Sequence, residues 1–359
     1  MSETVVVAMS GGVDSSLAAA LLVEQGERVI GVTMKTFCYS GNVGPTRTCC
    51  GLEGIMDARR VADKLGIPHY VFDMEEAFTA SVIDDFVSEY VSGRTPNPCV
   101  RCNSNTKIPD LLRRARGFGA DTIATGHYAR ILRTDASTTP VALARALDLN
   151  KDQSYFLWGV PADVLPHLRF PVGELSKPEV RARARSLGLV TADKPESQEI
   201  CFVPSGDYAQ FLAGRVGAGH ASLTPGRMIT SSGDVVGEHT GYARYTVGQR
   251  KGLGGGRGRA LYVLGVNASS NEVVVGGEDE LFRNDVVIGD LNWLNEVPRV
   301  GEELRVQIRH RARAVRATVR SIDTATIALD LIEAQRAVTP GQSGVLYRDD
   351  IVVGGGRIR

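Results

Sequence analysis

The sequence predicts an α/β protein in which a parallel-sheet domain is followed by a small linker domain and a C-terminal antiparallel β-barrel. Short apolar runs alternate with helix-like stretches over the first half, which is typical of a parallel sheet covered by helices. Gly-rich segments follow residue 205, and repeated short strands fill the chain from about residue 283. Because 359 residues exceed one ordinary core, we expect domains at 1–205, 206–282 and 283–359.

The first part of the chain reads as strands and helices in alternation. Strands are predicted over 4–10, 28–35 and 69–74, and helices over 16–26 and 55–66. Gly26 and Gly66 end these helices, since a glycine after the last turn can adopt a left-handed conformation. This order favours a parallel sheet with helices on both faces.

Later segments extend the same pattern. A Pro- and Asn-rich turn is expected over 95–103, and a further strand over 121–132. Ser176 and Glu179 have the spacing of a capping box and predict the start of another helix. A β-hairpin is predicted over 261–276, within the linker domain.

Composition and charge exclude several classes of protein. No apolar run approaches the roughly 20 residues of a membrane span, and the N-terminus has no signal-peptide pattern, so we expect a cytoplasmic protein without a membrane partner. The 41 basic and 41 acidic residues argue against a generally basic nucleic-acid coat but allow local basic patches. Six cysteines are too few for a secreted disulfide scaffold, so Cys99 and Cys102 are expected to bind a metal or perform sulfur chemistry.

A Gly- and Ser-rich loop joins the first strand to the first helix. The stretch AMSGGVDSS places backbone N–H groups at a helix N-terminus, where a phosphate is favoured. Asp14 could hold a magnesium ion that bridges phosphates. The stretch is neither a Walker A nor a Rossmann fingerprint. The residues expected to bind nucleotide here are Ala8, Met9, Ser10, Gly11, Gly12, Val13, Asp14, Ser15 and Ser16.

This loop resembles the PP-loop of enzymes that cleave ATP to AMP and pyrophosphate. Further motifs occur in order along the chain: GRTPNPCVRCN, ATGHYAR, KDQSYFL, SQEICFVP, YTVGQRKGLG and TPGQSGVLY. Together these motifs are similar to those of the tRNA-specific 2-thiouridylase family. The resemblance implies an adenine nucleotide alpha hydrolase-like domain. It also implies that ATP activates the C2 oxygen of the wobble uridine by adenylation, and that sulfur then replaces this oxygen.

The resemblance also implies roles for individual residues. Cys102 matches the family's nucleophile, and Cys201 matches the residue that carries a persulfide. A thiolate or persulfide suits this step because it is a stronger nucleophile than water. Asn97, Pro98 and Cys99 match the contact with the flipped target base. The implied cofactors are ATP and magnesium, and the implied partners are the anticodon loop of tRNA and a persulfide donor or relay protein.

One position departs from the family pattern. Many members have an aspartate where this chain has Cys99, so a carboxylate base is missing here. Cys99, Cys102 and Cys201 could instead hold three irons of a 4Fe–4S cluster and leave the fourth iron to bind sulfide. The sequence leaves the persulfide and cluster routes open. Structural zinc is disfavoured because a fourth ligand at suitable spacing is not evident. The remaining cysteines are interpreted as bystanders: Cys38, Cys49 and Cys50.

Other matched positions lie along the whole chain. Met34 and Gly126 match residues that contact adenosine. The positions that match tRNA contacts are His127, Lys151, Asp152, Gln153, Arg309, His310 and Gln342. By alternation alone, the stretch 304–311 forms a strand with Leu304, Val306 and Ile308 on one face and Arg305, Gln307, Arg309 and Arg311 on the other. Charge alone suggests that Arg244, Arg250 and Lys251 extend this basic track.

Two other functions compete with this interpretation. A small-molecule PP-loop ATP pyrophosphatase, such as a synthetase, would explain SGGVDSS but leaves the cysteines without a role. A metal-stabilised RNA-binding module without catalysis would explain the cysteines and the basic barrel but leaves the PP-loop without a role. Measuring ATP turnover with and without tRNA separates these functions.

Overall fold

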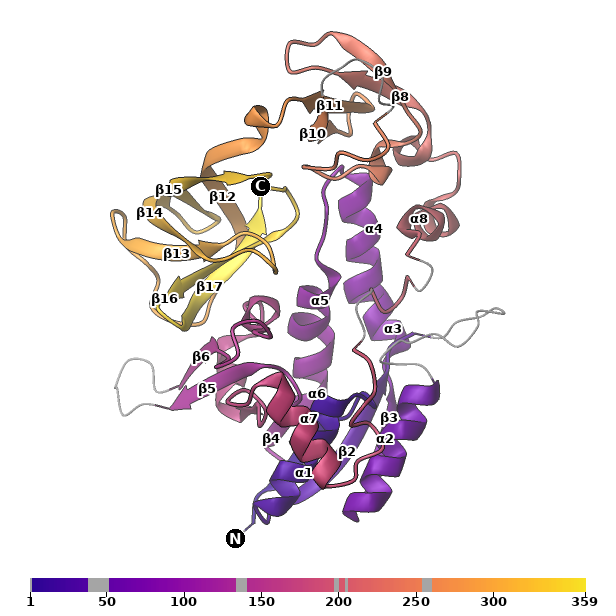
Figure 1. Ribbon diagram of the computed structural model, residues 1–359, viewed down its shortest axis with the longest axis vertical. Helices are drawn as coiled ribbons and strands as arrows, with labels where there is room; N and C mark the ends of the chain where they lie inside the picture. Colours follow the sequence, from indigo (N-terminus) through magenta and orange to yellow (C-terminus); the bar gives the residue numbers. More distant parts are fainter. Residues whose placement is uncertain (1, 38–51, 134–140, 197–199, 204–205, 254–259) are drawn as a thin grey trace.

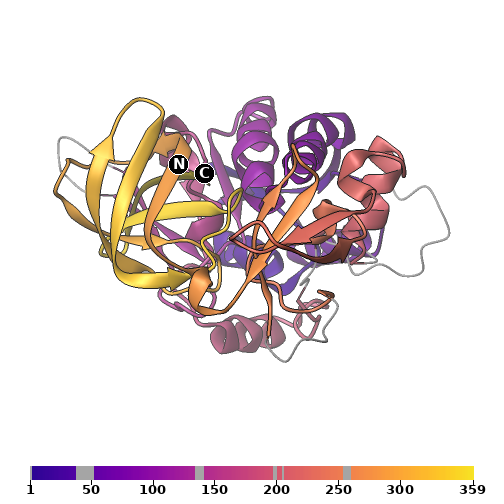
Figure 2. The same ribbon diagram turned by 90° about the horizontal axis from the view of Figure 1, so that it is seen from above.

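The computed structural model describes residues 2–37, 52–133, 141–196, 200–203, 206–253 and 260–359. Figure 1 shows the N-terminal α/β unit at the base, the C-terminal barrel on one side above it and a small sheet at the top. Figure 2 shows the barrel beside the helices of the first unit. In the part of the chain that is described, no helix is long and apolar enough to cross a membrane.

The α/β unit contains a parallel sheet in the order β3-β2-β1-β4-β7. Its strands are β1 (Thr4–Ala8), β2 (Arg28–Lys35), β3 (His69–Asp73), β4 (Thr122–Thr125) and β7 (Leu168–Arg169). One of its faces is covered by α1 (Val13–Glu24), α2 (Leu52–Leu65) and α7 (Lys177–Ser186). The predicted strands and helices of this region are confirmed, and Gly26 and Gly66 adopt the expected left-handed conformation with φ of +79° and +68°.

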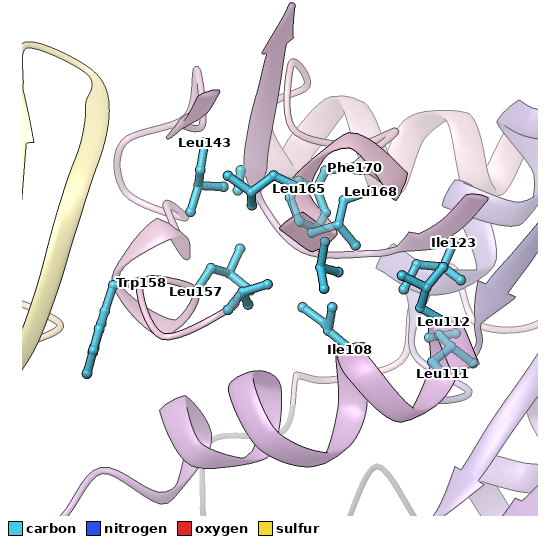
Figure 3. Packing of buried hydrophobic residues seen from close by; sticks show 14 of the residues in the cluster. Ile108, Leu111, Leu112, Ile123, Leu143, Leu157, Trp158, Leu165, Leu168 and Phe170 are labelled. Carbon is cyan, nitrogen blue, oxygen red and sulfur yellow. The ribbon is translucent and has the colours of Figure 1, made fainter. Parts of the chain in front are cut away.

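Helices cover both faces of this sheet because successive side chains of a strand point to opposite faces. Val5 and Val7 of β1 are buried with helices α1, α2 and α7, whereas Val6 is buried in a second cluster with helix α6 (Ile108–Arg116). Figure 3 shows residues of this second cluster, among them Ile108, Leu111 and Leu112 on α6, Ile123 on β4 and Leu168 on β7.

Two long helical segments lie between the domains. The first consists of α3 (Glu75–Phe78), the π-helix η1 (Thr79–Ile83) and α4 (Asp84–Val91), and the second of α5 (Pro98–Arg101), the π-helix η2 (Cys102–Lys107) and α6. Hydroxyl groups of Ser81 and Thr106 join the two π-helices at 2.6 Å. The turn predicted over 95–103 is therefore wrong from Pro98 onward. Proline is favoured in the first helical turn, where its missing N–H has no intrahelical partner to lose.

The predicted strand over 121–132 is two strands in two different sheets. Pairing with the parallel sheet ends at Thr125, the last residue of β4. β5 (Ala129–Arg133) then forms a hairpin with β6 (Val141–Arg145), and this hairpin joins the sheet of the barrel. Gly126 lies at this break, and a Cβ atom there would lie 2.5 Å from the backbone nitrogen of Ser15. The chain thus passes tightly over the start of α1 before it turns toward the barrel.

The middle of the chain forms a small four-stranded sheet. Its order is β10-β11-β8-β9, and the predicted hairpin over 261–276 is confirmed as the antiparallel pair β10 and β11. The elements of this region are α8 (Tyr208–Val216), η5 (Ala221–Leu223), β8 (Gly226–Ile229), β9 (Val235–His239), η6 (Tyr242–Arg244), β10 (Tyr262–Asn267), β11 (Glu272–Gly276) and η7 (Asp279–Leu281). Short 3-10 helices in the first domain are η3 (Ser154–Phe156) and η4 (Ala162–His167).

The C-terminal strands close into an antiparallel barrel, as predicted. The barrel order is β12-β15-β14-β13-β16-β17, and pairing of β12 with β17 closes it. The strands are β12 (Phe282–Trp293), β13 (Glu303–Gln307), β14 (Val315–Ile322), β15 (Thr326–Arg336), β16 (Ser343–Arg348) and β17 (Ile351–Ile358). The predicted alternation fails at Gln307, which is buried, and β13 ends there. The side-chain oxygen of Gln307 accepts hydrogen bonds from Arg145 and Tyr347, and these bonds take the place of those that water would form at an exposed glutamine.

A buried cluster of charges ties the barrel to the helices. Glu89 of α4 is only 4% exposed and pairs with Arg94 and with Arg357 of β17, the latter at 3.0 Å. Arg357 and Arg101 both contact Asp85 of the same helix. The carboxylates of α4 thus hold both the last barrel strand and the segment that leads into α5.

We predict that Glu89→Gln destabilises the protein far more than the loss of an exposed ion pair. The substitution removes the carboxylate that Arg94 and Arg357 share. Because Arg357 keeps Asp85 as a partner, the free energy of unfolding should fall by about 2 kcal/mol, less than for a buried charge left with no partner. The control is Glu303→Gln, whose pair with Arg316 is exposed and should contribute less than about 1 kcal/mol. Urea denaturation measures both, and equal effects of the two substitutions would contradict the prediction.

Candidate functional site

The Gly- and Ser-rich loop lies at the carboxyl edge of the parallel sheet. β1 ends at Ala8, and the chain enters α1 at Val13 with Gly12 as the N-cap residue in an extended conformation. Ser10 N donates to Ser15 Oγ at 3.1 Å, and Ser15 and Ser16 hydroxyls both donate to the carbonyl of Gly12. These bonds fix the loop around the first turn of the helix.

The sheet topology brings the nucleotide-binding candidates together. The chain goes from β1 to β2 and β3 on one side and returns to β4 on the other, so the order reverses between β1 and β4. In open α/β sheets the crevice at such a reversal, beyond the carboxyl ends of the strands, is where ligands bind. The loop after β1, Gly126 after β4 and Met34 near the end of β2 all lie at this edge.

Asp14 lies in a network of charges that the sequence did not reveal. Lys177 Nζ donates to both carboxylate oxygens of Asp14, at 2.7 and 2.8 Å, and the Tyr128 hydroxyl donates to Oδ1 at 2.9 Å. Lys177 also pairs with Glu196 at 2.9 Å, and Glu196 in turn pairs with Lys151. Burial and the nearby Asp14 carboxylate raise the pKa of Tyr128, so its hydroxyl remains a donor.

The CxxC pair lies at the start of a helix. Asn97 precedes the helix, Pro98 and Cys99 lie in its first turn, and Cys102 begins the π-helix η2. π-helical segments are rare and occur frequently at functional sites. Val100, between the two cysteines, is buried in the same cluster as Ala8 and Met34, so this helix packs at the carboxyl edge of the sheet.

Cys102 and Cys201 come from distant segments and lie on one apolar cluster. Both are partly buried against the side chains around Phe78, Phe86 and Phe202, whereas Cys99 is exposed. All three are present as thiols rather than in a disulfide. Among the residues that the structure describes, no three His, Cys, Asp or Glu side chains come together in a metal-binding arrangement. The three thiols as placed therefore do not form a cluster site.

The charge of Lys107 affects the pKa of one group in the cysteine helix and of one group in the loop after β4. The protein atoms around Cys99 raise the pKa of its thiol despite its exposed surface, and the positive charge of Lys107 opposes this rise. Burial, together with Lys107, lowers the pKa of His127 to about 3. The positive charge of Lys107 thus acts both on Cys99, in the first turn of this helix, and on His127, which follows β4.

Comparison with known proteins decides the family. Family models match residues 3–205 as a tRNA methyl transferase HUP domain, 211–277 as a tRNA methyl transferase PRC-barrel domain and 283–358 as an aminomethyltransferase beta-barrel domain. A tRNA-specific 2-thiouridylase MnmA from Carboxydothermus hydrogenoformans is 47% identical over 99% of this chain and 97% of its own. This chain belongs to the tRNA-specific 2-thiouridylase family.

Further comparisons agree with the family or add only a distant likeness. The thiouridylase MnmA of Geobacter metallireducens is 48% identical over 99% of this chain and 96% of its own. A solved 4-thiouridine synthetase–RNA complex with bound ATP is 15% identical over 60% of this chain and 51% of its own, with a TM-score of 0.35. That structural likeness is too low to support an inference.

The positions matched to tRNA contacts in the thiouridylase family occupy different environments. Lys151 is about one-third exposed and pairs with Glu196, and Gln153 Oε1 accepts from the backbone of Tyr128 at 2.9 Å. Asp152 is buried and accepts hydrogen bonds from Ala146, Ser154 and Arg145. In this structure Asp152 therefore holds the shape of the KDQSYFL segment.

The matched barrel residues lie where the barrel meets the first domain. Arg309 donates to the carbonyl of Arg336, and the His310 ring lies 4.3 Å from the ring of Phe156. Gln342 Nε2 donates to the Thr95 carbonyl at 2.8 Å, and Thr95 N donates to the Pro340 carbonyl at 2.9 Å. The TPGQSG loop thus holds the segment that leads into Asn97 and the cysteine helix.

Local sequence patterns did not reveal three residues of this site. Tyr128, Lys177 and Glu196 contact Asp14 directly or through one another. The sequence did contain one indication of the role of Lys177. This lysine lies in the first turn of a helix, where a positive charge is unfavourable to the helix dipole, so its position suggests an acidic partner or an anion nearby. Cys38, Cys49 and Cys50, and the first three residues of SQEICFVP, lie outside the described residues.

We predict that His127 stays neutral throughout the physiological pH range. Its Nδ1 lies 2.7 Å from the Thr125 hydroxyl, and its pKa is lowered from 6.5 to about 3 by burial. Because the folded state binds this proton more weakly than the unfolded state, the associated stability is complete above pH 6.5 and is lost as pH falls toward 3. NMR of labelled histidines should show no titration of His127 between about pH 5 and 8; a midpoint near 6.5 would contradict the prediction.

Proposed function

We propose that this protein is an ATP-dependent tRNA uridine 2-sulfurtransferase. One observation carries the proposal: the PP-loop, Gly126 and the helix that bears Cys102 meet at one edge of the sheet, and Cys102 and Cys201 both pack on one apolar cluster. An ATP site and a pair of thiols are what adenylation followed by sulfur transfer requires. Membership in the thiouridylase family supports the same activity.

The first step activates the target oxygen. The C2 oxygen of uridine attacks the α-phosphorus of ATP, pyrophosphate leaves, and the base carries an AMP ester with a good leaving group. The loop after β1 supplies the backbone N–H groups that face the phosphates at the start of α1. Asp14 fits a magnesium ion because it offers a partly exposed carboxylate at this loop, and such an ion would neutralise charge on the phosphates.

The second step delivers sulfur through a persulfide. A donor protein converts the Cys201 thiol to a persulfide, and the Cys102 thiolate attacks the Cys201 sulfur. A disulfide forms between the two cysteines, and the released hydrosulfide adds to C2 and displaces AMP. An external thiol then reduces the disulfide. We prefer this route to a 4Fe–4S cluster because the described thiols are not arranged as ligands of one metal group.

We propose that the barrel, residues 283–359, binds the tRNA backbone, and that Asn97, Pro98 and Cys99 hold the flipped uridine. Arg305 and Arg311 are exposed on the barrel and offer positive charges to phosphates. The segment before Asn97 is held by Gln342 of the barrel, so binding of the tRNA body would be linked to the position of the base pocket.

The test is reconstitution with purified protein, ATP, a tRNA transcript with uridine at position 34 and a persulfide donor. We expect tRNA-dependent AMP release and 2-thiouridine in the digested tRNA, both measured by mass spectrometry. AMP release without tRNA would instead indicate a small-molecule pyrophosphatase, and tRNA binding without AMP release would indicate a binding module.

A second experiment tests the persulfide route. Iron and acid-labile sulfide are measured on anaerobically purified wild-type protein and on the Cys99→Asp variant. Cluster-level iron that is lost in this variant together with thiolation would overturn the persulfide route.

A further inference from the structure

The PP-loop of this chain contains no cation of its own. Residues 8–16 include neither lysine nor arginine, although the pyrophosphate that leaves ATP carries several negative charges. A Walker A loop meets the same need with a lysine inside the loop. A cation for the phosphates must therefore come from elsewhere in the fold or from bound metal alone.

Lys177 lies at this place. Its side chain is 9% exposed, and its ammonium donates to both oxygens of Asp14, next to the N-terminal turn of α1. The ammonium also lies 5.6 Å from the centre of the Tyr128 ring. A buried lysine is costly unless it is paired, and here Asp14 and Glu196 supply the pairing.

The fold holds Lys177 in position from several directions. The capping box of Ser176 and Glu179 fixes the start of α7, and Lys177 N donates to the Asp148 carboxylate at 3.2 Å. α7 packs against α1 in one apolar cluster, which includes Val180 and Ala184. The ammonium therefore reaches the PP-loop from a rigid helix rather than from a loop.

Glu196 maintains this arrangement at working pH. Burial acts against its ionisation, but hydrogen bonds from Lys151 and Lys177 lower the pKa of Glu196 to about 2. Its carboxylate is therefore charged at neutral pH and is the second acidic partner of Lys177, in addition to Asp14. Lys151, on the outer side of Glu196, is about one-third exposed and shares the same carboxylate.

We propose that Lys177 is the phosphate-binding cation of this PP-loop and exchanges partners when ATP binds. In the nucleotide-free protein its ammonium neutralises Asp14. With ATP and magnesium present, Asp14 turns to the metal and Lys177 donates to oxygens of the β- and γ-phosphates. The Asp14 carboxylate and the Lys177 ammonium are each paired with an opposite charge in both states. Without ATP, the paired Lys177 does not attract other anions, and with ATP bound, the metal-bound Asp14 does not repel the phosphates. This inference rests on the ATP use stated under the proposed function.

The test compares nucleotide affinities of the full-length protein by calorimetry. Lys177→Met should weaken binding of magnesium–ATP by roughly 10- to 100-fold, the loss expected for a hydrogen bond to a charged group. It should leave the affinity for adenosine unchanged, and Lys177→Arg should recover part of the ATP affinity. Lys64→Met is the matched control, because it makes the same change at an exposed position of α2 and should retain ATP binding.

A second variant covers the case in which Lys177→Met does not fold. Asp14→Asn removes the carboxylate that competes for the ammonium, so metal-free ATP should bind more tightly than to the wild type. Wild-type ATP affinity in Lys177→Met, an equal loss for ATP and adenosine, or weaker metal-free binding in Asp14→Asn would each overturn the assignment. These measurements report ATP affinity and not thiolation, so the two proposals can fail separately. If Lys177→Met lowers ATP affinity but the wild-type protein makes no 2-thiouridine, the proposed function is wrong and the assignment of Lys177 stands.

Discussion

Cys102→Ser and Cys201→Ser should each lower 2-thiouridine formation by roughly 1000-fold or more, the scale seen when a covalent nucleophile is removed. Serine keeps the size of the side chain, but its hydroxyl can neither carry a persulfide nor attack one at neutral pH. Both residues are partly buried against the same apolar cluster, so neither change should disturb the core. Thiolated nucleosides are quantified by mass spectrometry after single turnover with a persulfide donor.

Binding measurements separate chemistry from folding in these variants. Affinity for ATP and for tRNA should remain at the wild-type level, because the PP-loop and barrel are unchanged. Cys99→Ser is the control for covalent chemistry: Cys99 is proposed to contact the uridine but has no covalent role in the persulfide route, so this change should lower thiolation far less than the other two. Thiolation that survives in Cys102→Ser or Cys201→Ser, or that disappears equally in Cys99→Ser, would rule out the assigned roles.

Gly126→Ala should destabilise the protein and weaken the nucleotide site, because there is no room for a methyl group at this position. The added Cβ would lie 2.5 Å from Ser15 N and 2.6 Å from the Asp14 carbonyl carbon, and backbone atoms cannot move aside as a flexible side chain can. We expect a loss of about 1–3 kcal/mol in the free energy of unfolding, the usual cost of overpacking, together with weaker ATP binding. Chemical denaturation and calorimetry measure the two effects.

Gly12→Ala is the control within the same loop. A Cβ at Gly12 meets only the Ser10 hydroxyl at 3.5 Å, and its φ of −97° is one that any residue adopts. Its free energy of unfolding should fall by less than about 1 kcal/mol, the cost of alanine in place of glycine at a helix N-cap. Equal stability of Gly126→Ala and Gly12→Ala would show that the close contact between Gly126 and the start of α1 does not constrain the fold.

The sequence carried the local features of the fold because they depend on neighbouring residues. Alternation of apolar runs and amphipathic stretches gave the parallel sheet and its helices, and Ser176 with Glu179 gave the start of α7. Two local patterns misled. The Pro-rich stretch 95–103 indicated a turn although Pro98 begins a helix, and alternation placed Gln307 on a solvent face although it is buried.

The sequence by itself determined the fold class, and it predicted the phosphate-binding loop and the reactive thiols, because each of these features depends on a short stretch of residues. Only the tertiary structure decided what those residues meet. Asp14 pairs with Lys177, β5 and β6 join the barrel sheet, and Gln342 holds the segment before the cysteines. Each of these contacts joins segments far apart in the chain. Their partners are selected by packing of whole elements, which no local periodicity records.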